Sequence, residues 1–152
     1  MKNSIFLFIT LVGLLFISCD DQSKDEIAFK ESQLLITSDI TGTWNWLSTD
    51  GGIGFHIHNT PASTGKTITL SISEDYQYEI KENDVSKSKG TYTLILKNSI
   101  YSGNPARFIE ISDDNYINQH VVLNGIISIA DEQQLNIADN FHDGIASQFS
   151  KQ

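Results

Sequence analysis

Hydrophobic and polar residues alternate without interruption over residues 67–73, where two isoleucines and a leucine are separated by threonines and serines. Because successive side chains of a β-strand point to opposite faces, this period of two predicts a strand with one buried and one exposed face. After a turn at residues 74–75, Tyr76, Tyr78 and Ile80 fall on one face of a second predicted strand. The two strands together indicate an antiparallel hairpin.

Further strand patterns follow at short intervals, and no segment after residue 38 has a convincing helical period. The other predicted strands are Gly42–Leu47, Gly90–Lys97, Arg107–Ser112, Val121–Ile129, Leu135–Ala138 and Ile145–Phe149. About eight short strands joined by hairpin-length turns predict an all-β fold, a small up-and-down antiparallel β-barrel without exposed edges. The interior of such a barrel is either packed with side chains or just able to hold one small ligand.

The N-terminus has a different pattern, because residues 5–17 are almost entirely apolar and follow a single lysine, Lys2. A helix of this length falls about 10 Å short of the roughly 30 Å hydrocarbon core of a membrane. The pattern therefore predicts a signal peptide over residues 1–18 rather than a membrane span. We expect residues 19–38 to form a flexible acidic tether and residues 39–152 to form the barrel domain.

The apolar segment ends in Phe16-Ile17-Ser18-Cys19, which resembles the bacterial lipobox. The resemblance implies cleavage before Cys19, thioether lipidation of its sulfur and acylation of its new amine, so that the lipid anchors the protein in a membrane. Phe16 replaces the usual leucine, as in the relaxed lipobox of Bacteroidetes-type bacteria. The alternative is an ordinary secretory signal, but Cys19 is the only cysteine, and an unpaired cysteine in an exported protein calls for an explanation.

Acidic residues follow Cys19 at once, at Asp20, Asp21, Asp25 and Glu26. This cluster resembles the signal that sends such lipoproteins to the outer face of the outer membrane. The alternative is a solvated acidic linker with no targeting role. We therefore expect an outer-membrane lipoprotein whose barrel faces either the cell exterior or the periplasm.

Gly42-Thr43-Trp44 opens the first predicted strand and looks like the Gly-x-Trp motif of lipocalins. The ordered series of motifs across residues 40–150 is similar to the short lipocalin-like lipoproteins of Bacteroidetes-type bacteria. This series also contains Gly51-Gly52-Ile53-Gly54, residues 64–70, Gly90-Thr91-Tyr92 and residues 139–144. The resemblance implies that Trp44 plugs the closed end of the barrel and that Gly42 allows close packing there. The chain is shorter than a full-length lipocalin, so a ligand cavity does not follow from the resemblance.

The net charge of −9 at pH 7 gives this chain no electrostatic reason to bind nucleic acid. Its length fits one domain with a real core, and we expect a monomer. The sequence contains no HExxH or GxSxG motif, and lipidation would leave no nucleophilic cysteine. The acidic pairs fall in predicted turns, where carboxylates rarely have the separated pKa values that acid–base catalysis needs. We therefore expect no enzymatic activity and no cofactor.

Two histidines, His56 and His58, lie two residues apart in a segment predicted to be extended and could chelate a metal. A third ligand would have to come from Asp50, His120 or His142, and nothing in the sequence places any of them nearby. Solvent-exposed histidines without a metal are the favoured interpretation.

Two glycine-containing segments resemble ion-binding loops. Residues 51–54 are as rich in glycine as a phosphate loop, but no helix pattern follows them, which favours a flexible loop at the barrel mouth. Residues 139–144 have the aspartates and glycine of a calcium loop, but Phe141 and Ser150 occupy ligand positions. A turn before the last strand is therefore favoured.

Aromatic residues fall mainly on the predicted inward faces and near the mouth. The candidates for lining a ligand pocket are Trp46, Phe55, Tyr76, Tyr78, Tyr92 and Phe108. Inward aromatics either line a pocket or fill a small barrel.

The predicted barrel, its inward aromatics and its loops are compatible with three functions. The first is a lipid-anchored barrel that binds a small apolar molecule or lipid, which predicts an open apolar cavity. The second is a non-catalytic surface protein that binds a protein or glycan partner through its loops, which predicts a filled interior and an exposed apolar patch. The third and least favoured is an enzyme with titratable groups converging in a cleft.

Overall fold

The computed structural model describes residues 24, 32–112, 120–131 and 133–152. The predicted signal peptide, the predicted lipidation site Cys19 and most of the predicted tether lie outside these residues. Among the helices that the structure does describe, none has the length and apolar character needed to cross a bilayer.

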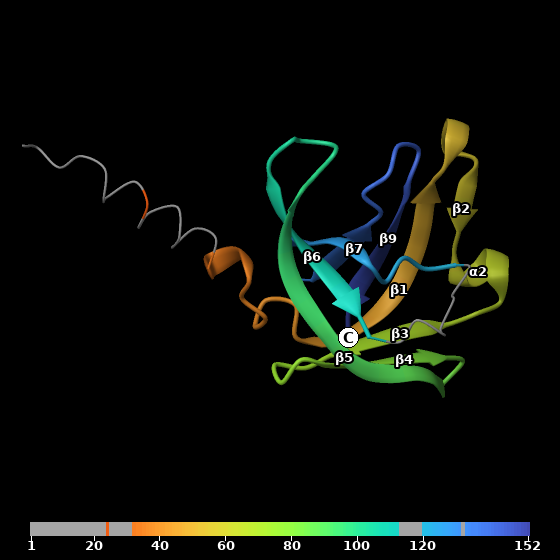
Figure 1. Ribbon diagram of the computed structural model, residues 1–152. Helices are drawn as coiled ribbons and strands as arrows, with labels where there is room; N and C mark the ends of the chain where they lie inside the picture. The colour runs from red at the N-terminus through yellow and green to blue at the C-terminus, as the bar shows by residue number, and fades with distance from the viewer. Residues whose placement is uncertain (1–23, 25–31, 113–119, 132) are drawn as a thin grey trace, which may run out of the picture.

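Antiparallel strands form a closed barrel, which confirms the predicted all-β, up-and-down architecture (Figure 1). In the described residues, eight strands make up the wall: β1 (Gly42–Gly51), β3 (Ile68–Ile72), β4 (Gln77–Glu82), β5 (Val85–Asn98), β6 (Pro105–Ile111), β7 (Gly125–Asp131), β8 (Gln134–Ala138) and β9 (Ile145–Lys151). Each strand pairs with the next along the chain, β1 pairs directly with β3, and β1 also pairs with β9. This last pairing joins the two edges of the sheet and closes the barrel.

A short segment outside the barrel wall separates β1 from β3. It contains a 3₁₀ turn, η1 (Ile53–Phe55), a three-residue strand, β2 (Ile57–Asn59), and a single helical turn, α2 (Pro61–Thr64). β2 pairs only with the end of β1, so it lies beside the barrel wall rather than within it. Thr60 caps α2 by accepting a hydrogen bond from the Ser63 backbone amide, which explains a helix this short.

The alternation seen in the sequence explains which side chains enter the barrel. Along β3, Ile68, Leu70 and Ile72 are buried and the residues between them are partly exposed. β1 follows the same rule until Leu47, where the register against β9 shifts. This bulge turns Thr49, rather than Ser48, toward the interior, because one extra residue reverses the alternation.

One continuous hydrophobic core fills the barrel, and all eight wall strands contribute to it. Its largest fully buried side chains are Trp44, Tyr92 and Phe149. Trp44 is completely buried, as a plug of the barrel would be. Its indole Nε1–H donates a 2.8 Å hydrogen bond to the Ile40 carbonyl, which fixes the chain that precedes β1.

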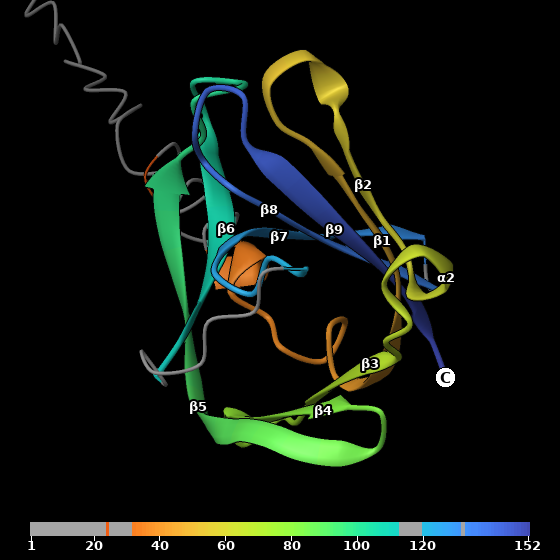
Figure 2. The same ribbon diagram turned by 90° about the vertical axis from the view of Figure 1, so that its right-hand side faces the viewer.

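Residues 36–40 cover the end of the barrel next to Trp44 (Figure 2). Ile40 is completely buried there, and Arg107 of β6 holds the segment from the other side. The Arg107 guanidinium donates 2.8 Å hydrogen bonds to both Asp39 carboxylate oxygens and a 2.7 Å bond to the Ile36 carbonyl. The last residues of the predicted tether are thus attached to the barrel.

The prediction of a continuous strand over Val121–Ile129 is wrong for its first part. β7 begins only at Gly125, while Val121, Val122 and Leu123 are buried in the core without strand pairing. Gly125 has φ +158°, and a Cβ there would lie 2.2 Å from the Ala138 carbonyl oxygen, so the chain enters β7 through a position that only glycine fits. Residues 121–123 instead close the second end of the barrel (Figure 2).

Candidate functional site

The structure brings three of the predicted pocket-lining residues together in the core. Trp46, Tyr78 and Tyr92 are all buried, and the polar atom of each has a partner inside the protein. The Trp46 indole N–H donates to Thr49 Oγ1 (3.0 Å), the Tyr78 hydroxyl lies 2.8 Å from Ser88 Oγ, and the Tyr92 hydroxyl donates to the Ser73 carbonyl (2.8 Å). These side chains fill the interior and hold their polar atoms within it.

Tyr92 is the interior residue whose titration is most affected by its surroundings. Burial raises the pKa of its phenol to about 12, and the neighbouring Tyr76 adds to the shift. The phenol therefore stays neutral far above neutral pH, as expected for a hydroxyl that donates a hydrogen bond within a core.

The other three predicted pocket residues lie elsewhere. Tyr76 is half exposed just before β4, where its ring centroid lies 5.5 Å from that of Tyr92. Phe55 lies at the end of η1 and is almost fully exposed. Phe108 is buried on β6 opposite Ile95 of β5 but does not belong to the core cluster, whereas its neighbour Ile109 does. Ligand binding by any of the six stays a prediction.

A chain of buried polar side chains that the sequence did not predict lies at the second end of the barrel. Thr49 and Ser147 are completely buried with their hydroxyl oxygens 2.6 Å apart, and Ser147 Oγ also accepts the Val122 backbone N–H at 2.8 Å. Because Trp46 donates to Thr49, the chain links β1, β9 and the segment before β7. The shift of register at Leu47 was the missing information, since strict alternation points Thr49 outward.

Three loops project together on one side of the molecule, as both views show (Figures 1 and 2). They are the β1–β2 loop, the β5–β6 loop (residues 99–104) and the β8–β9 loop (residues 139–144). The segment 139–144 precedes β9, as the predicted turn does. Residues 51–54, predicted to be a flexible loop, instead span the last residue of β1 and the start of η1.

Hydrogen bonds from side chains and backbone tie the three loops to one another. The Tyr101 hydroxyl lies 2.8 Å from the Asp139 carbonyl oxygen and 3.0 Å from that of Phe141, and the Ile100 amide donates to Asn140 Oδ1 at 2.9 Å. On the other side, the Gly52 amide donates to the Gly144 carbonyl at 3.1 Å. The β8–β9 loop is therefore held between its two neighbours.

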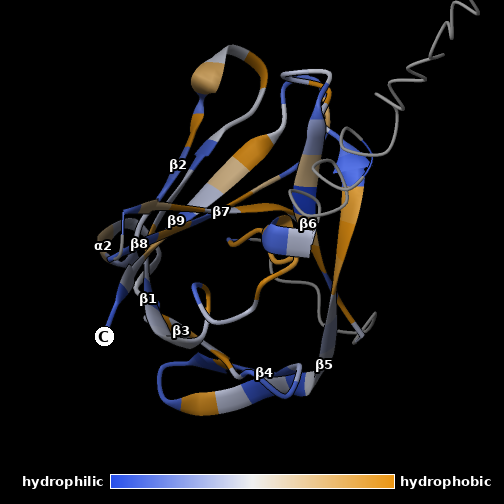
Figure 3. Ribbon diagram, turned by 90° about the vertical axis from the view of Figure 1, so that its left-hand side faces the viewer, coloured by the Kyte–Doolittle hydropathy of each residue, from blue (hydrophilic) through white to orange (hydrophobic). Residues whose placement is uncertain are grey.

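These loops carry most of the strongly exposed hydrophobic side chains among the described residues. The exposed fractions are 75% for Ile53, 88% for Phe55, 61% for Tyr101 and 70% for Phe141, and Ile100 is also exposed. Figure 3 shows the hydrophobic character of the β1–β2 loop at its tip. We call Ile53, Phe55, Ile100, Tyr101 and Phe141 the three-loop face. Of these five residues only Phe55 was a candidate from the sequence, because alternation along a strand says nothing about which loops meet.

The charges around the three-loop face are acidic. The three loops contain no lysine or arginine, whereas Asp139 and Asp143 lie in the β8–β9 loop and Asp50 precedes the β1–β2 loop. Hydrogen bonds from Ser48 and then from His58 lower the pKa of Asp50, so this carboxyl stays ionised at neutral pH.

The histidines considered as metal ligands have other contacts. His58 Nδ1 pairs with Asp50, and His56 Nδ1 lies 2.5 Å from the Ile53 carbonyl oxygen. In the part of the chain that the structure describes, no three His, Cys, Asp or Glu side chains come together as a metal-binding group.

The closed antiparallel barrel is compatible with a lipocalin-like fold and is capable of ligand binding. Comparisons with models of protein families, with curated proteins and with solved structures find no match to this chain.

Proposed function

We propose that this protein is a lipid-anchored, non-catalytic binding protein whose packed barrel presents the three-loop face to a protein partner. The observation that carries the proposal is the combination of a filled interior with four strongly exposed hydrophobic residues on loops that are tied together. Of the functions compared from the sequence, the loop-binding protein is the one for which both features are expected.

The hydrogen bonds between the loops support recognition of a large partner. Loops that are already held in place lose little conformational freedom when they bind, so more of the contact energy contributes to affinity. Aromatic side chains are the residues that most often dominate the binding energy of protein interfaces. Phe55 and Phe141, the most exposed aromatics of the face, are the residues expected to contribute most.

The charges of the three-loop face indicate which kind of partner surface would fit it. A face with an apolar centre, with aspartates in or beside its loops and no lysine or arginine within those loops, is repelled by nucleic acids and by anionic lipid surfaces. It complements a protein surface in which lysines or arginines surround an apolar pocket.

The proposed anchor rests on the lipobox-like segment that ends at Cys19 and on the acidic residues after it. It places the protein in the outer membrane, with the barrel facing the exterior or the periplasm. A lipid anchor would raise the effective concentration of the three-loop face near partners in the same membrane.

Photo-crosslinking in the producing cell tests the proposal. A photoreactive phenylalanine replaces Phe55 or Phe141 in the full chain, and Val85, an exposed hydrophobic residue in the β4–β5 hairpin, is the matched control position. The expected result is one protein adduct common to positions 55 and 141 and absent at 85. The identified partner, once purified, should bind Phe141→Ser at least about tenfold more weakly than the unaltered protein.

Two results would contradict the proposal. One is the absence of any protein adduct at positions 55 and 141 above the level at 85. The other is a stoichiometric apolar molecule found inside the barrel by native mass spectrometry of the purified full chain, which would favour the small-ligand function. Phe141→Ser should leave the free energy of unfolding within about 0.5 kcal/mol, because the side chain is exposed.

A further inference from the structure

The barrel end next to Trp44 has an exposed hydrophobic surface of its own. Leu34, Leu35 and Ile36 follow one another in the chain, and their exposed fractions are 40%, 37% and 37%. Tyr76, in the turn between β3 and β4, is 48% exposed. We call these four residues the anchor-side face, and none of them belongs to the three-loop face.

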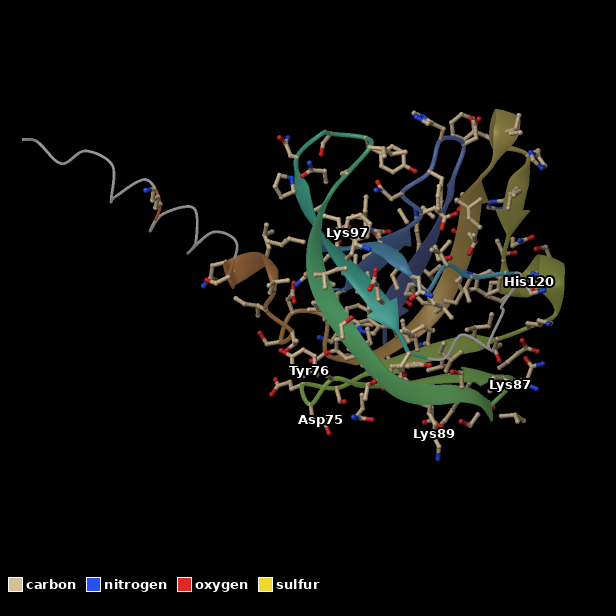
Figure 4. All side chains as sticks on the ribbon, viewed as in Figure 1. Asp75, Tyr76, Lys87, Lys89, Lys97 and His120 are labelled. Carbon is tan, nitrogen blue, oxygen red and sulfur yellow. The ribbon has the colours of Figure 1, made fainter. Side chains whose placement is uncertain are left out.

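The surroundings of Tyr92 show that Tyr76 lies at the same end as the segment before β1. The ring centroids of Tyr76 and Tyr92 are 5.5 Å apart. Burial and the neighbouring Tyr76 raise the pKa of the Tyr92 phenol, and the charges of Arg107 and Asp39 also act on it. Figure 4 shows Tyr76 on the side of the molecule where the orange segment before β1 lies.

The backbone conformation of Tyr76 does not explain why a tyrosine occupies this position. Tyr76 has φ +61°, a left-handed conformation that bulky residues rarely adopt. The next turn, between β4 and β5, places Asn83 and Asp84 at φ +50° and +63°, and these residue types tolerate that region well. A bulky ring held in this conformation and left half exposed indicates a role at the surface.

The segment that carries the three aliphatic side chains is fixed to the barrel. Arg107 binds both the Ile36 carbonyl and the Asp39 carboxylate. The Thr41 hydroxyl donates a 3.0 Å hydrogen bond to the Thr37 carbonyl. Apolar side chains on a segment that is already held in place lose little conformational freedom when they make a contact.

The proposed lipid anchor identifies the surface that this end can meet. Residue 32, where the continuous described chain begins, comes only 13 residues after Cys19. A chain of that length spans at most about 45 Å when fully extended. Because the chain enters the barrel domain at this end, the anchor-side face reaches the membrane with the least extension of the preceding residues.

The charges around the anchor-side face select the lipid headgroups. Asp39 is the only charged residue in the segment 32–41, and it is paired with Arg107. Glu74 and Asp75 directly precede Tyr76, and no lysine or arginine lies in that turn. Uncompensated carboxylates are repelled by anionic lipids, so zwitterionic headgroups fit this surface better.

We infer that the anchor-side face lies in the headgroup region of a zwitterionic phospholipid bilayer, an inference that rests on the lipid anchor of the proposed function. Aliphatic side chains enter the boundary between headgroups and acyl chains, and a tyrosine ring with its hydroxyl suits the same depth. The lipid holds the protein in the membrane, and the face sets the orientation of the barrel. The three-loop face projects to another side and stays accessible to a partner (Figure 1).

Tryptophan fluorescence of the full lipidated chain in phosphatidylcholine vesicles tests the inference. Leu34→Trp and Tyr76→Trp place a probe on the face, while the buried Trp44 and Trp46 give a background measured on the unaltered protein. In vesicles with brominated acyl chains, the added fluorescence at both positions should fall at least about twofold, because such side chains lie about 5–10 Å into the interface.

Val85→Trp is the matched control. Val85 is 57% exposed, more than either probe position, and it follows the opposite end of β4 from Tyr76. Its added fluorescence should not change in brominated vesicles. In brominated phosphatidylglycerol, quenching at positions 34 and 76 should weaken, and 1 M NaCl should restore it.

The inference is overturned if a vesicle-bound chain shows no quenching at positions 34 and 76, if position 85 is quenched as strongly, or if phosphatidylglycerol leaves the quenching unchanged. Sedimentation of the unaltered chain with vesicles reports the proposed anchor separately. A chain that sediments without quenching retains the anchor and loses only this inference, whereas a chain that does not sediment contradicts both. Crosslinking at the three-loop face is independent of either result.

Discussion

One end of the barrel is closed by residues 36–40, which directly precede β1, and the other by residues 121–123, which lie between β6 and β7 (Figure 2). At the first end, an arginine side chain binds a carboxylate and a carbonyl. At the second end, two buried serine and threonine hydroxyls bind one another and a backbone amide. The first closure is ionic and partly solvent-exposed, whereas the second is neutral and buried.

The two closures differ in how many segments of the chain must be in place before each can form. Trp44 and Ile40 are four residues apart, so the first closure forms largely within one segment, with Arg107 added from β6. The second requires β1, β9 and the segment before β7 to be in place at once. The two ends should therefore respond differently to mutation, salt and pH.

Replacing Trp44 with alanine should have the largest effect. The change removes a completely buried indole and its hydrogen bond to Ile40, so the free energy of unfolding should fall by about 3–5 kcal/mol. Urea denaturation followed by circular dichroism measures this loss. A change within about 0.5 kcal/mol would contradict the role of Trp44 as the plug of the first end.

Replacing Asp39 with alanine should destabilise the protein by about 1.5–3 kcal/mol at low salt, because Arg107 loses two charge-assisted hydrogen bonds while its side chain stays largely buried. The Asp39 side chain is partly exposed, so this difference should shrink when denaturation is repeated in 1 M NaCl. A difference that does not change with salt would mean that the first end is not held by charge.

Replacing Ser147 with alanine tests the second end. It leaves the Val122 amide and the Thr49 hydroxyl without their buried partner, at a cost of about 1–3 kcal/mol. Because no ionic group takes part, the loss should be the same at low and high salt. The Asp39 and Ser147 variants thus serve as controls for each other, and equal salt dependence would remove the distinction between the ends.

Replacing Tyr92 with phenylalanine should have the smallest effect at neutral pH, about 1 kcal/mol for the lost bond to Ser73. In the unaltered protein, the folded phenol has a pKa of about 12 against 10 when unfolded, so the folded state retains a proton that the unfolded state loses. Stability should therefore fall as pH rises from 10 to 12. The variant should lack this pH-dependent contribution to stability. An absorbance titration of the variant at 295 nm should also lack the tyrosine that ionises near pH 12.

Much of the barrel wall follows from the sequence. The alternation over residues 67–73 predicts β3 within one residue at each end, and Gly42-Thr43-Trp44 correctly marks the start of β1 and its buried tryptophan. These features are local, because each depends on the side-chain pattern of one strand.

The closure of the second end could not be predicted in the same way. The apolar residues 121–123 have the composition of a strand, and periodicity cannot distinguish a short buried strand from an unpaired segment buried in a core. Likewise, the bulge at Leu47 depends on the pairing of β1 with β9 and not on the sequence of β1 alone.

The candidate sites depend even more on long-range contacts. The three-loop face combines residues from three loops that are distant in sequence, and the hydroxyl of Tyr101 joins two of them. A polar groove lined by Thr43, Ser71, Glu79 and Lys89 likewise combines single residues from four strands, each of which is an ordinary polar position in its own strand. The sequence pattern predicts that such positions are solvent-exposed but does not predict that they are neighbours.

The pairing of β1 with β9 also sets the order in which the barrel can be completed. β1 ends at Gly51 and β9 begins at Ile145, so nearly the whole domain must be looped between the two strands before they meet. Contacts of such high sequence separation form late and slow the folding of β-proteins. Until β9 arrives, β1 and β8 each present an unpaired edge that can join another chain, so premature exposure of this intermediate favours aggregation.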